Sequence, residues 1–237
     1  MTVENSPAMY YKESADGWNT MTVQKSNCLA SKQDEEINVD YLVDVRDVIS
    51  PAEFDQIKQA IKVSSKQIYE KSNSKVTFRI ISFGYSGTSL VYPKDGLPSE
   101  AFDSYTTVIS AIDSLSQQST CDKNNNKAVL TTAYDGAFRF TYNSAPKYFF
   151  TFIGSDKNAV YEVKKGNEII SKLTQPNDII DTSIITSYNI DEATNLSGYA
   201  YDVASQSNGI IVRGWNCSAT LVNHIYKENT NPNVILM

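Results

Sequence analysis

The chain has 237 residues, which is enough for one large domain or for one domain with an extension. Hydrophobic residues make up 41% of it and charged residues 20%, a composition typical of a folded globular domain. Its 21 basic and 27 acidic residues leave a net charge of −6, which argues against nucleic acid as the main partner, because phosphate binding needs a basic surface. The longest apolar run, residues 148–153, is far shorter than the roughly 20 residues that span a bilayer, so no membrane insertion is expected.

The side chains that most often hold metals or carry catalysis are scarce. His224 is the only histidine, so a site with several histidine ligands is excluded. The three cysteines, Cys28, Cys121 and Cys217, are too few for a disulfide scaffold or a four-cysteine zinc site. No glycine-rich loop has the spacing of a phosphate-binding motif. We therefore expect that the chain is not an enzyme and that it holds no cofactor.

Both ends of the chain differ from its centre. Residues 1–36 are polar and lack the basic start and apolar run of a signal peptide, so they are predicted to form an N-terminal extension. Residues 231–237 follow a turn and become apolar, which predicts the start of a following element or a C-terminal tail. Residues 37–230 are predicted to form one domain, which we expect to be part of a larger protein.

Strand and helix patterns alternate along this domain. After a first strand at residues 37–45, Ser50, Pro51 and Glu53 form a capping-box pattern with proline at the first helical position. Apolar residues then follow at helical spacing to about Glu70, which makes this the best-marked helix. Further strands are expected at residues 76–83, 89–92, 148–153, 179–186 and 209–212, and further helices near residues 102–115, 127–138, 158–173, 193–204 and 218–227.

This order of elements predicts an α/β fold. Residues 84–87 look like a turn between the strands at 76–83 and 89–92, which predicts an antiparallel hairpin at a sheet edge. The near-continuous apolar strand at 148–153 is typical of a parallel sheet that is covered on both faces. The prediction is a mainly parallel, twisted sheet with one antiparallel edge hairpin and helices on both faces.

The order of elements is similar to that of the von Willebrand factor A (vWA) domain, a Rossmann-like three-layer sandwich, over residues 37–237. The first strand ends at Asp44 directly before the long helix, where vWA domains carry the motif Asp-x-Ser-x-Ser. Residues 198–212 resemble the short helix, turn and last strand of the family. Within the family, the chain looks most like the extracellular-matrix branch of the hemicentin type. In that branch, too, the polypeptide continues past the last helix.

The resemblance implies a metal-ion-dependent adhesion site, and the sequence departs from that site. In the family, this loop and two others supply oxygen ligands for Mg²⁺, an ion that prefers such ligands. Here Asp44 is kept, but the two serine positions are Arg46 and Val48, and the later aspartate position falls on Gly154 or Ser155. We therefore expect a degenerate site without a divalent metal, in which Arg46 pairs with Asp44 as a tethered cation.

Two catalytic interpretations are weaker than this one. Asp44 could be the nucleophile of a haloacid-dehalogenase phosphatase, but Arg46 stands where that motif needs a second aspartate. His224 could activate Cys217, but the two lie two helical turns apart and the residues around Cys217 match no nucleophile motif.

The compartment is predicted from weak signals. Asn195 and Asn216 lie in glycosylation sequons, which are compatible with secretion. Cys28 and Cys217 are candidates for a disulfide, and a bond between Cys28 and Cys121 fits nearly as well. Three buried thiols are the alternative to a disulfide. The favoured prediction is an extracellular protein, and an intracellular protein is the alternative.

Together these observations favour a protein-interaction or adhesion domain of a larger, secreted protein. Ligands of open parallel sheets bind at the loops that follow the carboxyl ends of the strands. An unidentified protein partner is expected to bind there without a divalent metal. Two alternatives stay open: an intracellular vWA-type scaffold in a multiprotein assembly, and a flavodoxin-like domain that binds or hydrolyses a small molecule. The candidate contact residues are Asp44, Arg46, Asp47, Asp122, Lys123, Ser155 and Asp156.

Overall fold

The chain divides into two compact units, Met1–Lys32 and Gln33–Met237. A computed structural model describes residues 9–14, 17–22, 36–85, 87–93, 105–119, 133–134, 145–154, 180–187, 209–226 and 234–236. In the first unit, β1 (Met9–Ser14) and β2 (Gly17–Thr22) pair in antiparallel fashion. The stretch that the sequence marks only as a polar extension therefore contains a two-stranded sheet.

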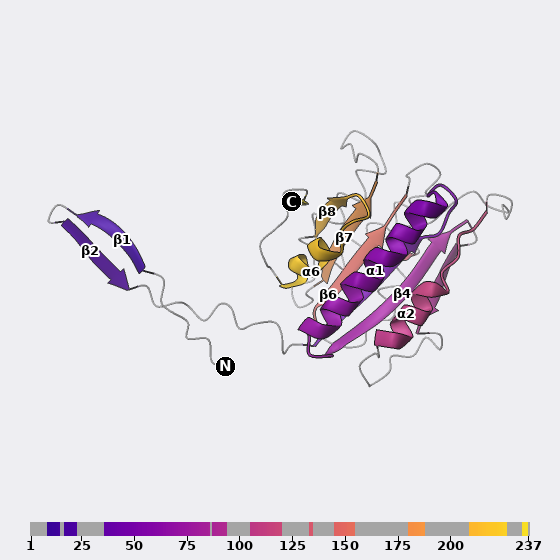
Figure 1. Ribbon diagram of the computed structural model, residues 1–237, viewed down its shortest axis with the longest axis horizontal. Helices are drawn as coiled ribbons and strands as arrows, with labels where there is room; N and C mark the ends of the chain where they lie inside the picture. The colour runs from indigo at the N-terminus through magenta and orange to yellow at the C-terminus, as the bar shows by residue number, and fades with distance from the viewer. Residues whose placement is uncertain are drawn as a thin grey trace. The chain divides into compact units, whose positions relative to one another are not determined.

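The second unit is built on a seven-stranded sheet with the order β5-β4-β3-β6-β7-β8-β9 (Figure 1). Parallel pairing joins β4, β3, β6, β7 and β8, whereas β5 and β9 are antiparallel strands at the two edges. The expected parallel sheet with an edge hairpin, formed by β4 and β5, is therefore confirmed. The strands are β3 (Ile37–Asp44), β4 (Val76–Gly84), β5 (Gly87–Tyr92), β6 (Lys147–Phe152), β7 (Ile180–Thr186), β8 (Ile210–Arg213) and β9 (Val234–Leu236).

The C-terminal strand β9 belongs to the main sheet. The sequence predicts that the apolar run within residues 231–237 starts a following element or forms a tail. In the structure, β9 pairs with β8, with Val212 opposite Val234. An edge strand presents unpaired backbone groups, and β9 satisfies those of β8 on that side. The sheet therefore carries an antiparallel strand at each edge.

The strand order describes the α/β topology. If β3 to β8 are counted from one to six, the order is 3-2-1-4-5-6, with the third strand antiparallel at the edge. The five parallel strands alone have the order 2-1-3-4-5, which is also that of a flavodoxin-like sheet. The antiparallel strand β5 at the edge is the addition to that order.

Three described helices cover one face of the sheet: α1 (Pro51–Lys71), α2 (Tyr105–Asp113) and α6 (Ser218–Tyr226) (Figure 1). α1 contacts both α2 and α6. The helices expected near residues 158–173 and 193–204, and that at 127–138 apart from residues 133–134, lie outside the described residues. In the described part of the chain, no helix is both long and apolar enough to cross a membrane.

The opposite face of the sheet is covered as well. Tyr41 points toward α1, where its hydroxyl meets Ser64. Because side chains alternate along a strand, Leu42 points away from α1. Leu42 and Phe149 are fully buried on that far face. There, the hydroxyls of Tyr134 and Thr151 lie 2.9 Å apart. The molecule is therefore the three-layer α/β sandwich that the sequence predicts.

α1 begins and packs as its sequence indicates. The Ser50 side chain accepts a hydrogen bond from the backbone N–H of Glu53, the Glu53 carboxylate accepts one from the backbone N–H of Ser50, and Pro51 occupies the first turn. On the buried side, the Tyr41 hydroxyl lies 3.0 Å from Ser64 Oγ and accepts a bond from Ser65 Oγ at 3.2 Å. These contacts join the middle of the helix to the middle of β3. The buried residues of α1 are Phe54, Ile57, Ala60, Ile61, Ser64, Ser65 and Ile68.

Candidate interaction site at the carboxyl edge of the sheet

The turn after β3 folds Arg46 back onto Asp44. Arg46 Nε donates to Asp44 Oδ1 at 2.9 Å, and Arg46 Nη2 donates to Asp44 Oδ2 at 2.7 Å. Both side chains are 0% exposed. This bidentate, charge-assisted geometry is the strong form of an arginine–carboxylate pair. The pair that the sequence predicts at this position is present.

The carboxylate of Asp44 has two further donors. The backbone N–H of Arg46 donates to Oδ1 at 3.1 Å, and the backbone N–H of Gly154 donates to Oδ2 at 3.2 Å. A Cβ atom on residue 154 would lie 2.0 Å from Ile49 Cγ1, so glycine lets the end of β6 approach this closely. The Asp44 carboxylate therefore accepts four hydrogen bonds, and a carboxylate has about four acceptor positions.

These residues do not fit a magnesium site. Mg²⁺ needs free oxygen ligands in a near-octahedral arrangement, and the one carboxylate of this loop that points inward is engaged by four donors. A guanidinium next to that carboxylate would also repel a divalent cation. Across the described ranges, no group of three or more His, Cys, Asp and Glu side chains is arranged to hold a metal ion.

The turn that contains Arg46 is fixed by the segment that follows α2. Gln118 donates its backbone N–H to the Val45 carbonyl at 2.6 Å, and its carbonyl accepts from the N–H of Asp47 at 3.1 Å. Gln117 Nε2 donates to the carbonyl of Ile49 at 2.7 Å. Hydrogen bonds from a segment about seventy residues away therefore hold the turn on both sides.

Two side chains at the tip of this turn reach solvent. Asp47 is exposed, and Tyr85 donates its hydroxyl to Asp47 Oδ1 at 2.8 Å. Burial of Tyr85 and this hydrogen bond raise the pKa of the Tyr85 phenol, so it stays protonated as the donor. Val48 is 39% exposed and is the one exposed large hydrophobic residue among the residues whose burial is described. The turn therefore presents an acidic and an apolar side chain on a fixed backbone.

The start of α1 connects this turn to the segment that follows β8. Glu53 accepts a hydrogen bond from Trp215 Nε1 at 3.4 Å, and the Trp215 ring stacks on Phe152 with centroids 6.4 Å apart. Hydrogen bonds from the hydroxyl and backbone N–H of Ser50 lower the pKa of the Glu53 carboxyl. The segment after β8 is thereby joined to the same edge of the sheet as the turn after β3.

The structure corrects part of the predicted contact set. Asp44 and Arg46 lie at the expected edge, but both are fully buried, so neither side chain touches a partner in this conformation. Asp47 is the described candidate that reaches solvent. Val48 and Tyr85 were not among the predicted site residues. The exposure of Val48 has no local sequence signal, because it follows from the long-range bonds to Gln117 and Gln118. The candidates Asp122, Lys123, Ser155 and Asp156 lie outside the described residues.

The remaining candidate residues are placed as follows. Cys217 has a free thiol that is buried in the core, and desolvation raises the pKa of this thiol to about 12. His224 Nε2 lies 2.8 Å from Asp181 Oδ2, so the histidine is paired with a carboxylate. Asn216 is exposed. Cys28 and Asn195 lie outside the described residues.

Comparison with known proteins identifies the fold. Neither protein-family models nor curated proteins give a match to this chain. Among solved structures, it is similar to a von Willebrand factor type A protein from Catenulispora acidiphila, with 16% identity and a TM-score of 0.58 over 82% of this chain and 42% of that one. Proximal thread matrix protein 1 from the mussel byssus is similar with 13% identity and a TM-score of 0.57, over 86% of this chain and 49% of that one.

A third similar structure is that of the SpRpn10 VWA domain, with 14% identity and a TM-score of 0.55 over 78% of this chain and 94% of that one. The chain spans less than half the length of the first two proteins. At such identities the likeness concerns the fold. Together with the strand order, it shows that residues of the second unit adopt a vWA-type fold.

Proposed function

We propose that this chain is a non-enzymatic protein-interaction domain of a larger, secreted protein of the adhesion or matrix type. It binds its partner through the turn after β3, and it does so without a divalent metal. The observation that carries the proposal is the saturated Asp44 carboxylate, with the Arg46 guanidinium beside it and the exposed pair Asp47 and Val48 on the same turn.

Metal independence follows from the electrostatics of the pair. In a metal-dependent adhesion site, the ion supplies the positive charge that attracts an acidic group of the partner. Here the Arg46 guanidinium forms an ion pair with Asp44 inside the protein, and both side chains are buried. A partner therefore meets the backbone of the turn together with Asp47 and Val48. Recognition rests on an apolar contact and on polar contacts around it, as is usual for protein interfaces.

The fixed backbone of the turn supports its role as a contact surface. Gln118 holds residues 45–47 through backbone hydrogen bonds, Gln117 holds the Ile49 carbonyl through its side-chain amide, and Tyr85 holds the Asp47 side chain. A preorganised loop loses little conformational entropy on binding, so more of its contact energy contributes to affinity. An exposed apolar side chain on such a loop is the kind of residue that fills a pocket on a partner.

Three described candidates for a nucleophile or base are engaged elsewhere. Asp44 is bonded to Arg46, the Cys217 thiol is held protonated by burial, and His224 is paired with Asp181. A nucleophile needs an accessible, deprotonated atom next to a base. This supports the proposal that the domain is not an enzyme.

Calorimetric titration with Mg²⁺ and Mn²⁺ tests metal independence. The expected result is no heat of binding for either ion, in both the unmodified protein and an Asp44→Asn variant. Micromolar binding that is present in the unmodified protein and absent in Asp44→Asn would place a metal at this turn and end the proposal.

Photo-crosslinking tests the contact surface. A photoreactive phenylalanine analogue is introduced at Val48 and, as a matched control, at Thr107, which is exposed on α2. In extracts of the tissue or culture that produces the protein, the Val48 position should crosslink to a discrete protein with and without EDTA, whereas the Thr107 position should not. Equal crosslinking from both positions, or loss of the Val48 product in EDTA, contradicts the proposal.

An intracellular scaffold is the second candidate function. The buried free thiol of Cys217 favours it, because reduced thiols are typical of cytosolic proteins. The likeness to the SpRpn10 VWA domain, which extends over 94% of that chain, also agrees with it. The likeness to a thread matrix protein favours the secreted alternative. Intact mass of the natural protein before and after glycosidase treatment separates the two, because a glycan on Asn195 or Asn216 requires secretion.

A further inference from the structure

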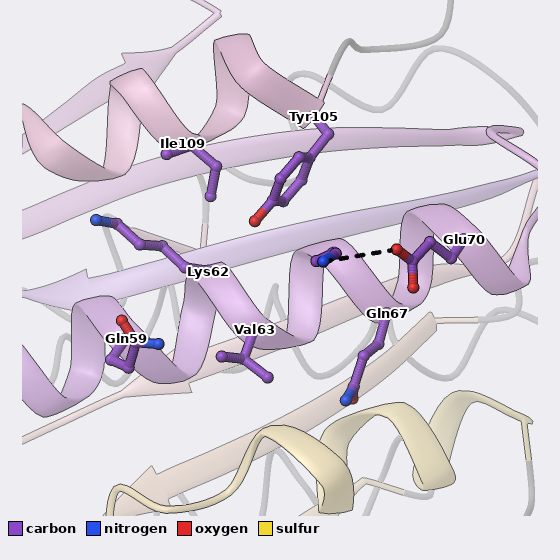
Figure 2. Close-up of a pocket in the computed structure, with 8 residues that line it drawn as sticks. Gln59, Lys62, Val63, Gln67, Glu70, Tyr105 and Ile109 are labelled. Atoms are coloured by element: carbon purple, nitrogen blue, oxygen red, sulfur yellow. Dashed lines mark ion pairs between the residues drawn. The ribbon is translucent and has the colours of Figure 1, made fainter.

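A groove of about 480 Å³ runs between α1 and α2, away from the turn after β3. Figure 2 shows Tyr105 and Ile109 extending from α2 toward α1, and Lys62 extending from α1 toward α2. The groove therefore has an apolar wall on α2 and a basic wall on α1. Its lining residues are Gln59, Lys62, Val63, Lys66, Gln67, Glu70, Tyr105 and Ile109.

The basic wall consists of Lys62 and Lys66, and Lys58 continues the same row beyond the groove, at intervals of four positions along one side of α1. Lys58 Nζ donates to the Asp113 carbonyl at 3.3 Å, and Lys62 Nζ donates to Asp113 Oδ1 at 2.5 Å, which shows that the row faces α2. Lys66 pairs with Glu70 of its own helix at 3.9 Å.

This row is unusual in a chain with a net charge of −6. Residues 56–69 of α1 contain three lysines and no carboxylate, and Asp55 and Glu70 flank this stretch. Because Asp55 and Asp113 add negative charge at the rim, the excess of positive charge is confined to the lining, where two lysines stand against one glutamate. The Lys66 and Glu70 side chains are 58% and 62% exposed, and an exposed pair of this kind contributes little, so an incoming carboxylate can replace it.

We propose that this groove binds an extended segment of a partner protein in which acidic and apolar side chains alternate. In an extended chain, successive side chains point to opposite sides. Acidic side chains would then meet Lys62 and Lys66 on one wall, while apolar side chains pack on Tyr105 and Ile109 on the other. Gln59 and Gln67, near the two ends of the lining, supply amide donors and acceptors for the backbone of the segment.

The length of the groove sets the length of the segment. Gln67 lies eight positions after Gln59 on the helix, which is about 12 Å at 1.5 Å per residue. An extended chain covers the same distance in about four residues at 3.3 Å each. A hexapeptide is therefore long enough to fill the groove with both of its ends in solvent.

Fluorescence anisotropy with three labelled, capped hexapeptides tests the chemistry. The first alternates leucine and glutamate, the second carries lysine in place of glutamate, and the third carries serine in place of leucine. Only the first should bind, and its affinity should fall as salt is added, because exposed charges are screened. Equal binding of the serine peptide, no binding of the first peptide up to millimolar concentration, or tighter binding of single-stranded DNA or anionic lipid vesicles would overturn the proposal.

Variants of the full chain locate the peptide. Lys66→Glu should weaken binding at least about tenfold, as expected for reversal of a charge that faces the ligand. Arg213→Glu changes the net charge equally at an exposed position on β8 and should leave the affinity unchanged. Glu70→Gln should strengthen binding, because it frees Lys66 and removes a repulsive carboxylate. If Arg213→Glu weakens binding as much as Lys66→Glu, the attraction is nonspecific and the groove is not the site.

The test is independent of the function proposed for the turn after β3. Val48→Asp leaves the groove intact, so it should not alter peptide affinity, whereas it should weaken binding of the protein that crosslinks at position 48. Circular dichroism spectra that match those of the unmodified chain confirm that each variant is folded. Loss of peptide binding in Val48→Asp would move the binding site from the groove to the turn and overturn the proposal.

Discussion

The charge of Asp44 is compensated by the Arg46 guanidinium at a position where neither side chain reaches solvent. Removing one member of a buried pair leaves the other charged and without its partner, which costs far more than an exposed pair contributes. We expect Arg46→Ala to lower the free energy of unfolding by about 3–5 kcal/mol. Urea denaturation followed by circular dichroism measures this change.

Two further variants make the prediction specific to burial of the pair. Arg213→Ala removes an exposed arginine from β8 and should change the free energy of unfolding by less than about 0.5 kcal/mol. The double variant Asp44→Leu, Arg46→Met removes both charges and should recover much of the stability lost in Arg46→Ala, because apolar residues of similar volume often replace a buried pair without loss. Equal destabilisation by Arg46→Ala and Arg213→Ala would show that the Asp44 charge is solvated.

The pair also shows what single residues reveal in a sequence. Asp44 and Arg46 stand two positions apart at the end of an apolar strand, so their interaction is local and the sequence predicts it. The complete burial of Arg46 depends on Gly154, Gln117 and Gln118, which are distant in the chain. A sequence pattern carries no information on such contacts, so the sequence places Arg46 among the candidate contact residues although its side chain is buried.

At the scale of elements, the start of α1 is a pH-dependent structure. Ser50 donates its hydroxyl to Glu53 Oε2 at 2.7 Å and its backbone N–H to the same oxygen at 3.1 Å, and these bonds lower the pKa of Glu53 below its ordinary value of 4.5. A depressed carboxyl pKa contributes stability above the unfolded-state value, and this contribution is lost as the pH falls through the folded-state value. The capping box should therefore stabilise the helix most at neutral pH.

We predict that Ser50→Ala lowers the free energy of unfolding by about 1 kcal/mol at neutral pH. The loss should become smaller as the pH falls through the folded-state pKa of Glu53, which lies below its ordinary value of 4.5. Urea denaturation over a series of pH values measures both quantities. In a Glu53→Gln background, the effect of Ser50→Ala should no longer depend on pH in the acid range. A pH dependence that persists in that background would assign the effect to another group.

Elements with strong local signals were predicted well, and those that depend on pairing partners were not. α1 has a capping box and a regular apolar stripe, and it was expected to about Glu70 and ends at Lys71. β6 was expected at residues 148–153 because its side chains are almost all apolar, and it occupies Lys147–Phe152. β9 also has an apolar run, but whether such a run joins this sheet or another element is decided by the free edge of β8.

For the whole molecule, alternation of strands and helices was enough to predict a mainly parallel sheet with helices on both faces. The strand order was implied by the vWA resemblance and by no local pattern, because order depends on the paths of the connections. The same limit applies to the groove between α1 and α2. Its lysine row is visible in the sequence, but its apolar wall is supplied by Tyr105 and Ile109 from another helix.

The two compact units lead to a prediction about truncated chains. The described members of the hydrophobic core cluster belong to the second unit, from Ile37 to Ile225. A chain of residues 33–237 should therefore unfold with the same midpoint and free energy as the full chain. Removal of residues 227–237 should instead lower stability and promote self-association, because the loss of β9 exposes the edge of β8. Urea denaturation and analytical ultracentrifugation of both truncations check this. Destabilisation of 33–237 by more than about 1 kcal/mol, a large change relative to the net stability of a domain, would show that the first unit contributes to the fold of the second.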